Sequence, residues 1–316
     1  MSTTQLFSLT SLFFLLTGLL LTPPEIHAQN TPNLAERLGY GPDAKLLIVH
    51  ADDIGMSHSV NEASFDALLS GAVSSGSVMV PCPWFPDAAE RARQHPELDL
   101  GIHVTLTAEW KNYRWDSVLP RSEVPTLHDS LGFLHATGEP FARVDPGEVE
   151  REVRAQIDRA IELGIKPTHL DTHMGTLFAS QELIELYIRL GKEYNVPVFL
   201  PRQWAAMAPQ MASILGEDAI LIDQYFILYD GIPAEEWPSF YSNIIEKLPP
   251  GVSQIIVHLA YDTPEMQAIT VDHDDFGSAW RQRDYDFFTS DTFRELLEKH
   301  DVKLITWREI GKLLKK

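Results

Sequence analysis

Short apolar segments alternate with helix-forming segments along this chain, and this alternation constrains the fold more than any other feature. Eight segments have the length and the β-branched composition of buried strands. They cover residues 45–51, 75–81, 98–106, 167–173, 196–201, 219–227, 253–261 and 302–307. Helical patterns stand between most of them, at 58–70, 86–94, 146–163, 180–194, 234–247 and 290–300, with a last one at 307–315.

This order of elements predicts a parallel sheet, because a helix returns the chain to the start of the next strand. We therefore expect an α/β fold, most simply a (β/α) barrel, although a doubly wound open sheet would show the same alternation. The chain of 316 residues has room for one large barrel. Region 107–145 breaks the rhythm, so we interpret it as an insertion over the site of a single domain that spans 29–316.

The first 28 residues have the pattern of an export signal. The apolar run at 12–21 is too short to span a bilayer comfortably, and Ala28 stands where a signal peptide would end. No Lys or Arg precedes Arg37, so the positive charge expected before the apolar run comes from the N-terminal amine alone. We expect residues 1–28 to be a signal peptide and the mature protein to be periplasmic or extracellular, without stable membrane insertion. An uncleaved N-terminal anchor is the alternative.

Charge and cysteine content exclude several classes of partner and site. The net charge of -20 and the pI near 4.9 argue against nucleic acid or an anionic membrane surface as a partner. Cys82 is the only cysteine, so an intrachain disulfide and a cysteine metal cluster are both impossible. Any metal must therefore be bound by His, Asp and Glu. No feature of the sequence predicts an oligomeric state.

Polar residues occupy the ends of four expected strands, where a barrel carries its functional groups. A buried charge costs several kcal/mol unless it is paired or bound to metal, so four such ends favour one shared site. The residues are Asp52 and Asp53, His103, Asp171 with His173, and His258. Two imidazoles and a carboxylate form a metal site with open positions, which is the catalytic rather than the structural pattern. The same ligands serve non-haem iron oxygenases, so they do not fix the reaction.

The stretch "LLIVHADDIGMS" places two carboxylates side by side where a buried strand ends. We interpret the pair as a division of labour, in which one aspartate binds a metal and its neighbour accepts a proton from water. Adjacent strand residues point to opposite faces, so the backbone must bend here, and Gly55 would ease the bend. The alternative is that one aspartate caps a helix that starts near Ser57 or Ser59.

Four segments resemble a known family in order and spacing. They are "HADDIGMSHSVNEA", "GIHVTLT", "PTHLDTH" and "IIVHLAYD", and they are similar to motifs of the YdjC-type carbohydrate deacetylases, which include chitooligosaccharide deacetylases. The resemblance runs from about Lys45 to Trp307. It implies an irregular, polysaccharide-deacetylase-like (β/α) barrel, one divalent metal ion (zinc or magnesium), and an acetylated amino sugar or oligosaccharide as substrate.

The resemblance also implies a role for each polar residue. Asp53 would be the metal carboxylate, and His103 and His173 would be the metal imidazoles. Asp52 would be the general base, and His258 would be the general acid that protonates the leaving amine. The chain departs from the family after this histidine. Family members commonly have Pro-Gly there, whereas this chain has Leu259-Ala260, which puts the loop geometry and the substrate class in question.

Four further side chains are candidates for supporting roles. Arg202 would orient Asp52 through a paired hydrogen bond, or would form a surface ion pair. Asp171 would support a metal imidazole from behind. Trp110 and Trp115, in "EWKNYRW", would contact a sugar ring or pack in the core.

Other classes of protein remain open from the sequence. A glycoside hydrolase would use paired carboxylates on a barrel but would have no use for His103 and His173. A different metal-dependent amidohydrolase would share the whole ligand set. A non-catalytic or redirected carbohydrate-binding barrel would tolerate the loss of Asp52, whereas a deacetylase would not.

Overall fold

The computed structural model describes residues 33–203, 215, 219–229 and 231–315. The expected signal peptide lies outside the described residues. Among the helices within these ranges, none is long and apolar enough to cross a membrane.

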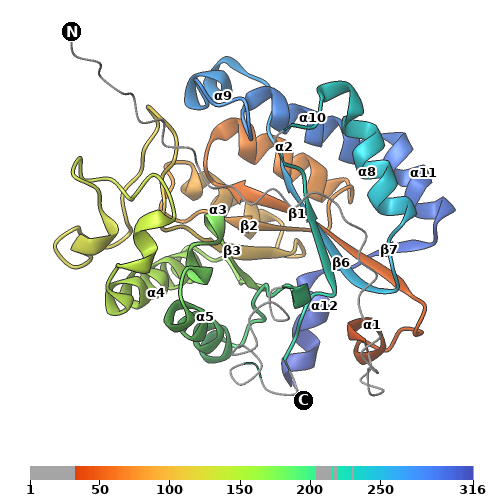
Figure 1. Cartoon of the computed structure of the whole chain (residues 1–316), viewed down its shortest axis with the longest axis horizontal. Coiled ribbons are helices and arrows are strands. Elements are labelled where there is room, and N and C mark those ends of the chain that lie inside the picture. The colour runs from red at the N-terminus through yellow and green to blue at the C-terminus, as the bar shows by residue number, and fades with distance from the viewer. Residues whose placement is uncertain (1–32, 204–214, 216–218, 230, 316) are drawn as a thin grey trace, which may run out of the picture. The chain divides into compact units, whose positions relative to one another are not determined.

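A curled sheet of parallel strands forms the centre of residues 33–315. Its strands are β1 (Lys45–Ile54), β2 (Ser75–Val78), β3 (Leu100–Val104), β4 (Leu170–Thr172), β5 (Gln224–Ile227), β6 (Gly251–His258) and β7 (Val302–Leu304). The order is β4-β3-β2-β1-β6-β5, and β7 pairs with the first part of β1. The long central strand β1 lies beside β6 (Figure 1) and pairs with it from Lys45 to Asp52.

An irregular segment joins the two edges of this sheet. Isolated parallel bridges connect Leu170 with Val198 and Pro201 with Ile222. The backbone N–H of Asp223 then donates to the carbonyl of Val252 in β6 at 3.0 Å. The predicted (β/α) barrel is therefore confirmed, in an irregular form. The expected strand at 196–201 contributes bridges instead of a regular ladder, because its two prolines have no N–H to donate.

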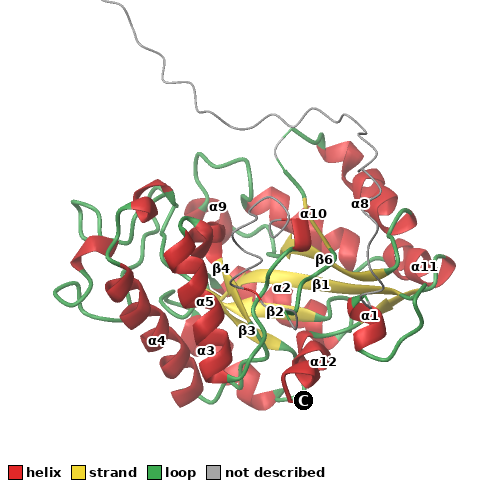
Figure 2. Ribbon diagram, turned by 60° about the horizontal axis from the view of Figure 1, so that its bottom comes forward, coloured by secondary structure: helices red, strands yellow, loops and turns green. Residues whose placement is uncertain are grey.

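Helices surround the sheet on its outer side (Figures 1 and 2). They are α1 (Leu34–Arg37), α2 (His58–Leu69), α3 (Phe85–Gln94), α4 (Pro146–Glu162), α5 (Gln181–Tyr194), α8 (Trp237–Glu246), α9 (Pro264–Ile269), α10 (Ser278–Phe288), α11 (Asp291–Lys299) and α12 (Trp307–Ile310). The helix expected at 307–315 consists of α12 and a 3₁₀ turn at Gly311–Lys315. Helix α10 has no counterpart in the sequence prediction, and it contributes to the site described below.

The region at 107–145 is mostly irregular, with two short 3₁₀ turns at Pro125–Leu127 and Glu139–Ala142. Two carboxylates of α4 anchor it. Glu152 accepts hydrogen bonds from the backbone of Val118 (2.9 Å) and Leu119 (3.0 Å), and Glu148 accepts one from Thr126 (2.7 Å). Because these loop N–H groups have partners, the region is fixed to α4 without regular secondary structure.

Candidate active site

The end of β1 bends at Asp53, and this bend brings two neighbouring aspartates to one site. Asp53 has a φ of 66°, which a residue with a side chain rarely adopts, and Gly55 follows with a φ of 98°. The pairing with β2 shifts register between Ala51 and Ile54. The helix-capping alternative is wrong, because the side chain that caps α2 is Ser57, which accepts the N–H of Val60.

Three donor atoms from β1, β3 and the end of β4 converge at the catalytic end. Oδ1 of Asp53 lies 3.4 Å from Nε2 of His103 and 3.4 Å from Nδ1 of His173, and the two imidazole nitrogens are 3.2 Å apart. All three side chains are buried. Donors bound tetrahedrally to zinc at about 2.0–2.1 Å lie roughly 3.3–3.4 Å from one another. The three atoms therefore fit a divalent ion.

A carboxylate holds each imidazole from behind. Nδ1–H of His103 donates to Asp171 at 2.9 Å, and Nε2–H of His173 donates to Glu109 at 3.0 Å. Nε2 of His103 and Nδ1 of His173 are then the nitrogens that face Asp53, and they can bind a metal ion in place of a proton. A carboxylate partner of this kind fixes the tautomer and ring orientation of a metal-binding histidine. Asp171 thus lies where it was predicted to lie, whereas Glu109, in the inserted region, was not predicted.

A buried arginine holds Asp53 in place. Nη2 of Arg281 donates to Oδ2 of Asp53 at 2.7 Å, and Nε donates to the carbonyl of Phe276 at 2.6 Å. The guanidinium lies 5.7 Å from the ring centre of Trp110. Burial raises the pKa of Asp53, but the charge of Arg281 and the contacts with His103 and His173 together outweigh burial and hold this pKa well below its usual range. Asp53 therefore stays ionised and leaves Oδ1 for a ligand.

The surrounding carboxylates make the three-donor site attractive to a cation. Burial lowers the pKa of His173, but Glu109 and Asp53 raise it to about 9. Burial likewise opposes the charge on His103, but Asp171 and Asp52 raise its pKa well above the usual value. An electrostatic field that stabilises a proton on these nitrogens also stabilises a metal ion bound to them.

Asp52 and His258 lie beside the three donors and face the cavity. Oδ2 of Asp52 is 3.9 Å from Nε2 of His258 and 3.9 Å from Nε2 of His103. The two residues are register partners across β1 and β6. Burial lowers the pKa of His258 to about 4, so its imidazole is neutral at neutral pH.

The backbone on either side of His258 is fixed by α10. The N–H of His258 donates to Asp284 at 3.1 Å. Leu259 and Ala260, where the chain departs from the family pattern, are both fully buried, and the N–H of Ala260 donates to the carbonyl of Arg281 at 3.4 Å. The changed residues therefore form part of the core and keep His258 at the cavity.

A cavity of about 650 Å³ opens over these residues. Asp52, Asp53, His103, His173 and His258 all line it. Much of the remaining wall is aromatic, and it includes Trp110, Phe178, Phe199, Tyr225, Tyr229 and Phe276.

The two tryptophans of the inserted region differ in position. Trp110 is a wall residue of the cavity. Trp115 is buried, and its indole N–H donates to the carbonyl of Thr107 at 2.9 Å. Among the described residues that line the cavity Trp115 does not appear. Trp115 is therefore a packing residue, which was the alternative to a sugar contact.

The predicted role of Arg202 is wrong. Its Nε and Nη2 lie 3.0 and 2.9 Å from Oδ1 of Asp223, and its side chain is 51% exposed. Arg202 therefore forms the surface ion pair that was the alternative interpretation. The backbone N–H of Arg202 donates to the carbonyl of Ile222 at 2.9 Å, which places its side chain beside Asp223 instead of Asp52. The arginine that contacts an aspartate of the pair is Arg281 of α10.

Fold and site together define a (β/α) barrel with a two-histidine, one-carboxylate centre at the carboxyl ends of its strands. The chain belongs to the YdjC-like protein family, whose sequence model matches residues 46–299. The family expected from the four motifs is thereby confirmed.

Two relatives and one solved structure show the extent of the similarity. A carbohydrate deacetylase of Thermus thermophilus is 33% identical over 292 residues, which cover 89% of this chain and 99% of the relative. A carbohydrate deacetylase of Brevibacillus brevis is 28% identical and covers 84% of this chain and 99% of its own length. A crystal structure of an Enterococcus faecalis protein aligns with a TM-score of 0.71 at 25% identity, over 84% of this chain and 99% of that one.

Proposed function

We propose that this protein is a metal-dependent hydrolase that removes acetyl groups from N-acetylated amino sugars or short oligosaccharides. The observation that carries the proposal is the set of three donor atoms 3.2–3.4 Å apart, with Asp52 beside them in the lining of a cavity. The named activity of the relatives, carbohydrate deacetylation, supports the same reaction.

Asp53, His103 and His173 would hold the ion. When bound, a divalent ion in such a site polarises the acetyl carbonyl and lowers the pKa of water. We propose zinc, because two of the three donors are imidazole nitrogens, whereas magnesium prefers oxygen ligands. The competing ion, magnesium, is distinguished by the test below.

Asp52 and His258 would move the protons. Asp52 accepts a proton from the attacking water, since its Oδ2 faces the cavity and the three donors. His258 rests as a neutral imidazole, so it must receive a proton before it can act as an acid. Asp52, at 3.9 Å, is the group that supplies it, and His258 then donates that proton to the departing amine.

The cavity suits a sugar of limited size. Its volume of about 650 Å³ is that of a small-molecule site and would hold a short oligosaccharide. Aromatic side chains of the wall, among them Trp110 and Tyr229, would pack against the apolar faces of the rings.

We further propose that the protein is exported. The support is the apolar run at 12–21, followed by Ala28, before the first residues of the barrel. N-terminal sequencing of the protein recovered outside the cytoplasm tests this proposal. A new N-terminus near Gln29 is expected, whereas an intact Met1 in the membrane fraction would indicate an uncleaved anchor.

The reaction is tested by release of acetate from N-acetylglucosamine oligomers. Purified protein is assayed as isolated, after removal of metal with a chelator, and after addition of zinc or magnesium. The expected result is acetate release that chelation abolishes and zinc restores. Metal-bound protein that releases no acetate from any oligomer would overturn the proposed substrate class.

A further inference from the structure

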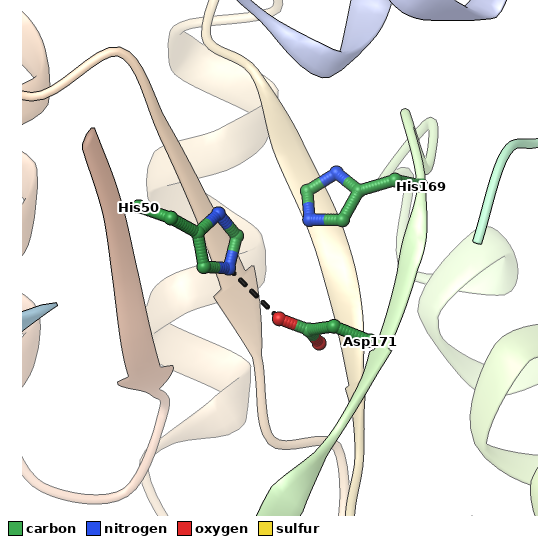
Figure 3. Close-up of side chains that lie close together, drawn as sticks. All are labelled: His50, His169 and Asp171. Atoms are coloured by element: carbon green, nitrogen blue, oxygen red, sulfur yellow. Dashed lines mark hydrogen bonds and ion pairs between the residues drawn. The ribbon is translucent and has the colours of Figure 1, made fainter. Parts of the chain in front are cut away.

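A further buried histidine, His50, lies in β1 two residues before Asp52, and the proposed reaction makes no use of it. Its side chain is fully buried. Figure 3 shows a ring nitrogen of His50 directed at a carboxylate oxygen of Asp171, with the ring of His169 beside the pair. A buried imidazole normally requires partners for both nitrogens, so the partners of His50 indicate its role.

One nitrogen of His50 faces two carboxylates of the candidate active site. Nε2 lies 2.8 Å from Oδ2 of Asp171 and 3.1 Å from Oδ1 of Asp52. Asp171 is the carboxylate that orients His103, and Asp52 is the proposed general base. The N–H at Nε2 thus donates to the support of a metal ligand and lies within ion-pair distance of the group that accepts the proton. Oγ of Ser77 is also 3.1 Å from Nε2, and its hydroxyl donates to the same Oδ2 of Asp171 at 2.8 Å.

The other nitrogen fixes the ring from the opposite side. Nδ1 lies 3.1 Å from Oγ of Ser75, and the hydroxyl of Ser75 donates to Oδ1 of Asp99 at 2.7 Å. Because the hydrogen of this hydroxyl is already used, Oγ accepts from Nδ1–H of His50. Asp99 in turn accepts the backbone N–H of Arg308 at 2.7 Å. His50 is therefore anchored, through Ser75 and Asp99, to the first turn of α12.

Both nitrogens of His50 act as donors in this arrangement, which makes the ring an imidazolium. Burial lowers the pKa of His50, but its contacts with Asp171 and Asp52 raise it to about 9. Arg281 supplies the other buried positive charge of the site. Asp52, Asp53, Asp171 and Glu109 bring four negative charges, so the two cations leave a deficit that a divalent ion fills.

We propose that His50 is a positioning residue, which holds Asp171 behind the metal ligand His103 and holds Asp52 in place for proton transfer. The part that concerns Asp52 rests on the proposed function. The part that concerns Asp171 depends only on the metal centre, so a measurement of metal binding tests it separately.

His169 provides a matched control at the same depth of the barrel. It is fully buried, and its ring centre lies 4.9 Å from that of His50. Its Nδ1 bonds to the hydroxyl of Thr168 at 3.0 Å, and its ring stacks on Trp307 at 5.0 Å. Within the described part of the chain, Nε2 of His169 has no hydrogen-bond partner, so removal of this ring withdraws no bond from either carboxylate.

The experiment compares His50→Ala, His169→Ala and His50→Gln. Zinc affinity is measured by competition with a chelating dye, and kcat and KM for an N-acetylglucosamine oligomer are measured at saturating zinc. We expect His50→Ala to weaken zinc binding about tenfold, the lower end of effects seen for supporting groups, and to lower kcat at unchanged KM. His169→Ala should leave both quantities within about twofold. Gln carries an amide N–H near the position of Nε2, so His50→Gln should restore most of the zinc affinity.

Equal zinc affinity in His50→Ala and His169→Ala would overturn the proposal, since His50 would then be only a packing residue. If His50→Ala does not fold, His50→Phe fills the same space without an N–H and takes its place. If the unmodified protein binds zinc but releases no acetate, the proposed function fails, and the zinc measurements still decide the link from His50 to Asp171.

Discussion

The two sides of the candidate metal centre are built differently. On the ligand side, Arg281, Asp171 and Glu109 each hold one of the three donor residues through a hydrogen bond of 2.7–3.0 Å. On the cavity side, the functional atoms of Asp52 and His258 stand 3.9 Å apart, outside hydrogen-bond distance.

The ligand side is thus suited to metal binding, and the cavity side is suited to proton transfer. A fixed set of donors loses little entropy when an ion binds, because its geometry is already set. Groups that transfer protons need space for a substrate between them, and their hydrogen bonds tighten only when it is bound. Asp53 belongs to the ligand side and its sequence neighbour Asp52 belongs to the cavity side. Substitutions on either side should therefore have separable effects.

The largest effect is expected for Asp53→Asn. This change removes the charged metal ligand and leaves the buried Arg281 without its counterion. We expect zinc content after dialysis to fall to background and acetate release to disappear with it. Asp272→Asn, which alters an exposed carboxylate, is the control. Full zinc occupancy in Asp53→Asn would contradict the assignment of the ligand side.

The next effect is expected for His258→Gln, on the cavity side. Loss of the proton donor should lower kcat about 100-fold, which is within the range for one acid–base group. Zinc affinity should stay within about twofold, because His258 is not among the three donors. A parallel loss of zinc would mean that His258 belongs to the ligand side.

A smaller effect is expected for Glu109→Gln. The amide keeps the shape but weakens the bond to Nε2 of His173, so zinc affinity should fall by roughly 10–100-fold. Glu123→Gln removes an exposed charge from the same inserted region and serves as the matched control. Equal zinc affinities in the two variants would show that Glu109 does not support the ligand side.

The last effect concerns stability, at Asp284 of α10, which accepts the backbone N–H of the cavity-side residue His258. Burial raises the pKa of Asp284 from 3.8 to about 6, although Trp237 and Tyr241 donate hydrogen bonds to it. A raised pKa favours the protonated folded state, so this contribution is complete below about pH 4 and is lost as pH rises through about 6. The loss amounts to up to about 3 kcal/mol.

Urea unfolding at pH 4.5 and pH 7 measures this contribution through Asp284→Asn. The variant cannot ionise, so its destabilisation relative to the unmodified protein should be smaller at pH 7 than at pH 4.5. The same destabilisation at both values would show that Asp284 does not titrate between them.

The sequence predicted the strands well, because buried parallel strands are continuous apolar runs bounded by turns. It did not predict α10, whose stretch "SAWRQRDYDFF" buries Arg281 and Asp284 beside aromatic residues and so lacks a simple apolar stripe. The prediction of a regular strand at 196–201 was wrong, because Pro197 and Pro201 have no N–H to donate to a neighbouring strand.

The residues of the candidate site likewise fall into those that the sequence predicted and those that it did not. Residues at strand ends could be brought together from the sequence, since the strand ends of a barrel share one face. Glu109 and Arg281 lie in the inserted region and in α10, and their approach to the centre depends on tertiary packing that no local pattern records. Arg202 was misplaced for the related reason that its strand end is irregular.

The most direct test of the whole account is the metal content of Asp52→Asn measured beside its acetate release. Asp52 is adjacent in sequence to a proposed ligand but lies on the cavity side of the centre. If Asp52 acts only as the general base, zinc should bind as in the unmodified protein and turnover should fall by about 10²–10⁴-fold. Loss of zinc together with activity would contradict this assignment, because Asp52 would then be a metal ligand as well as Asp53.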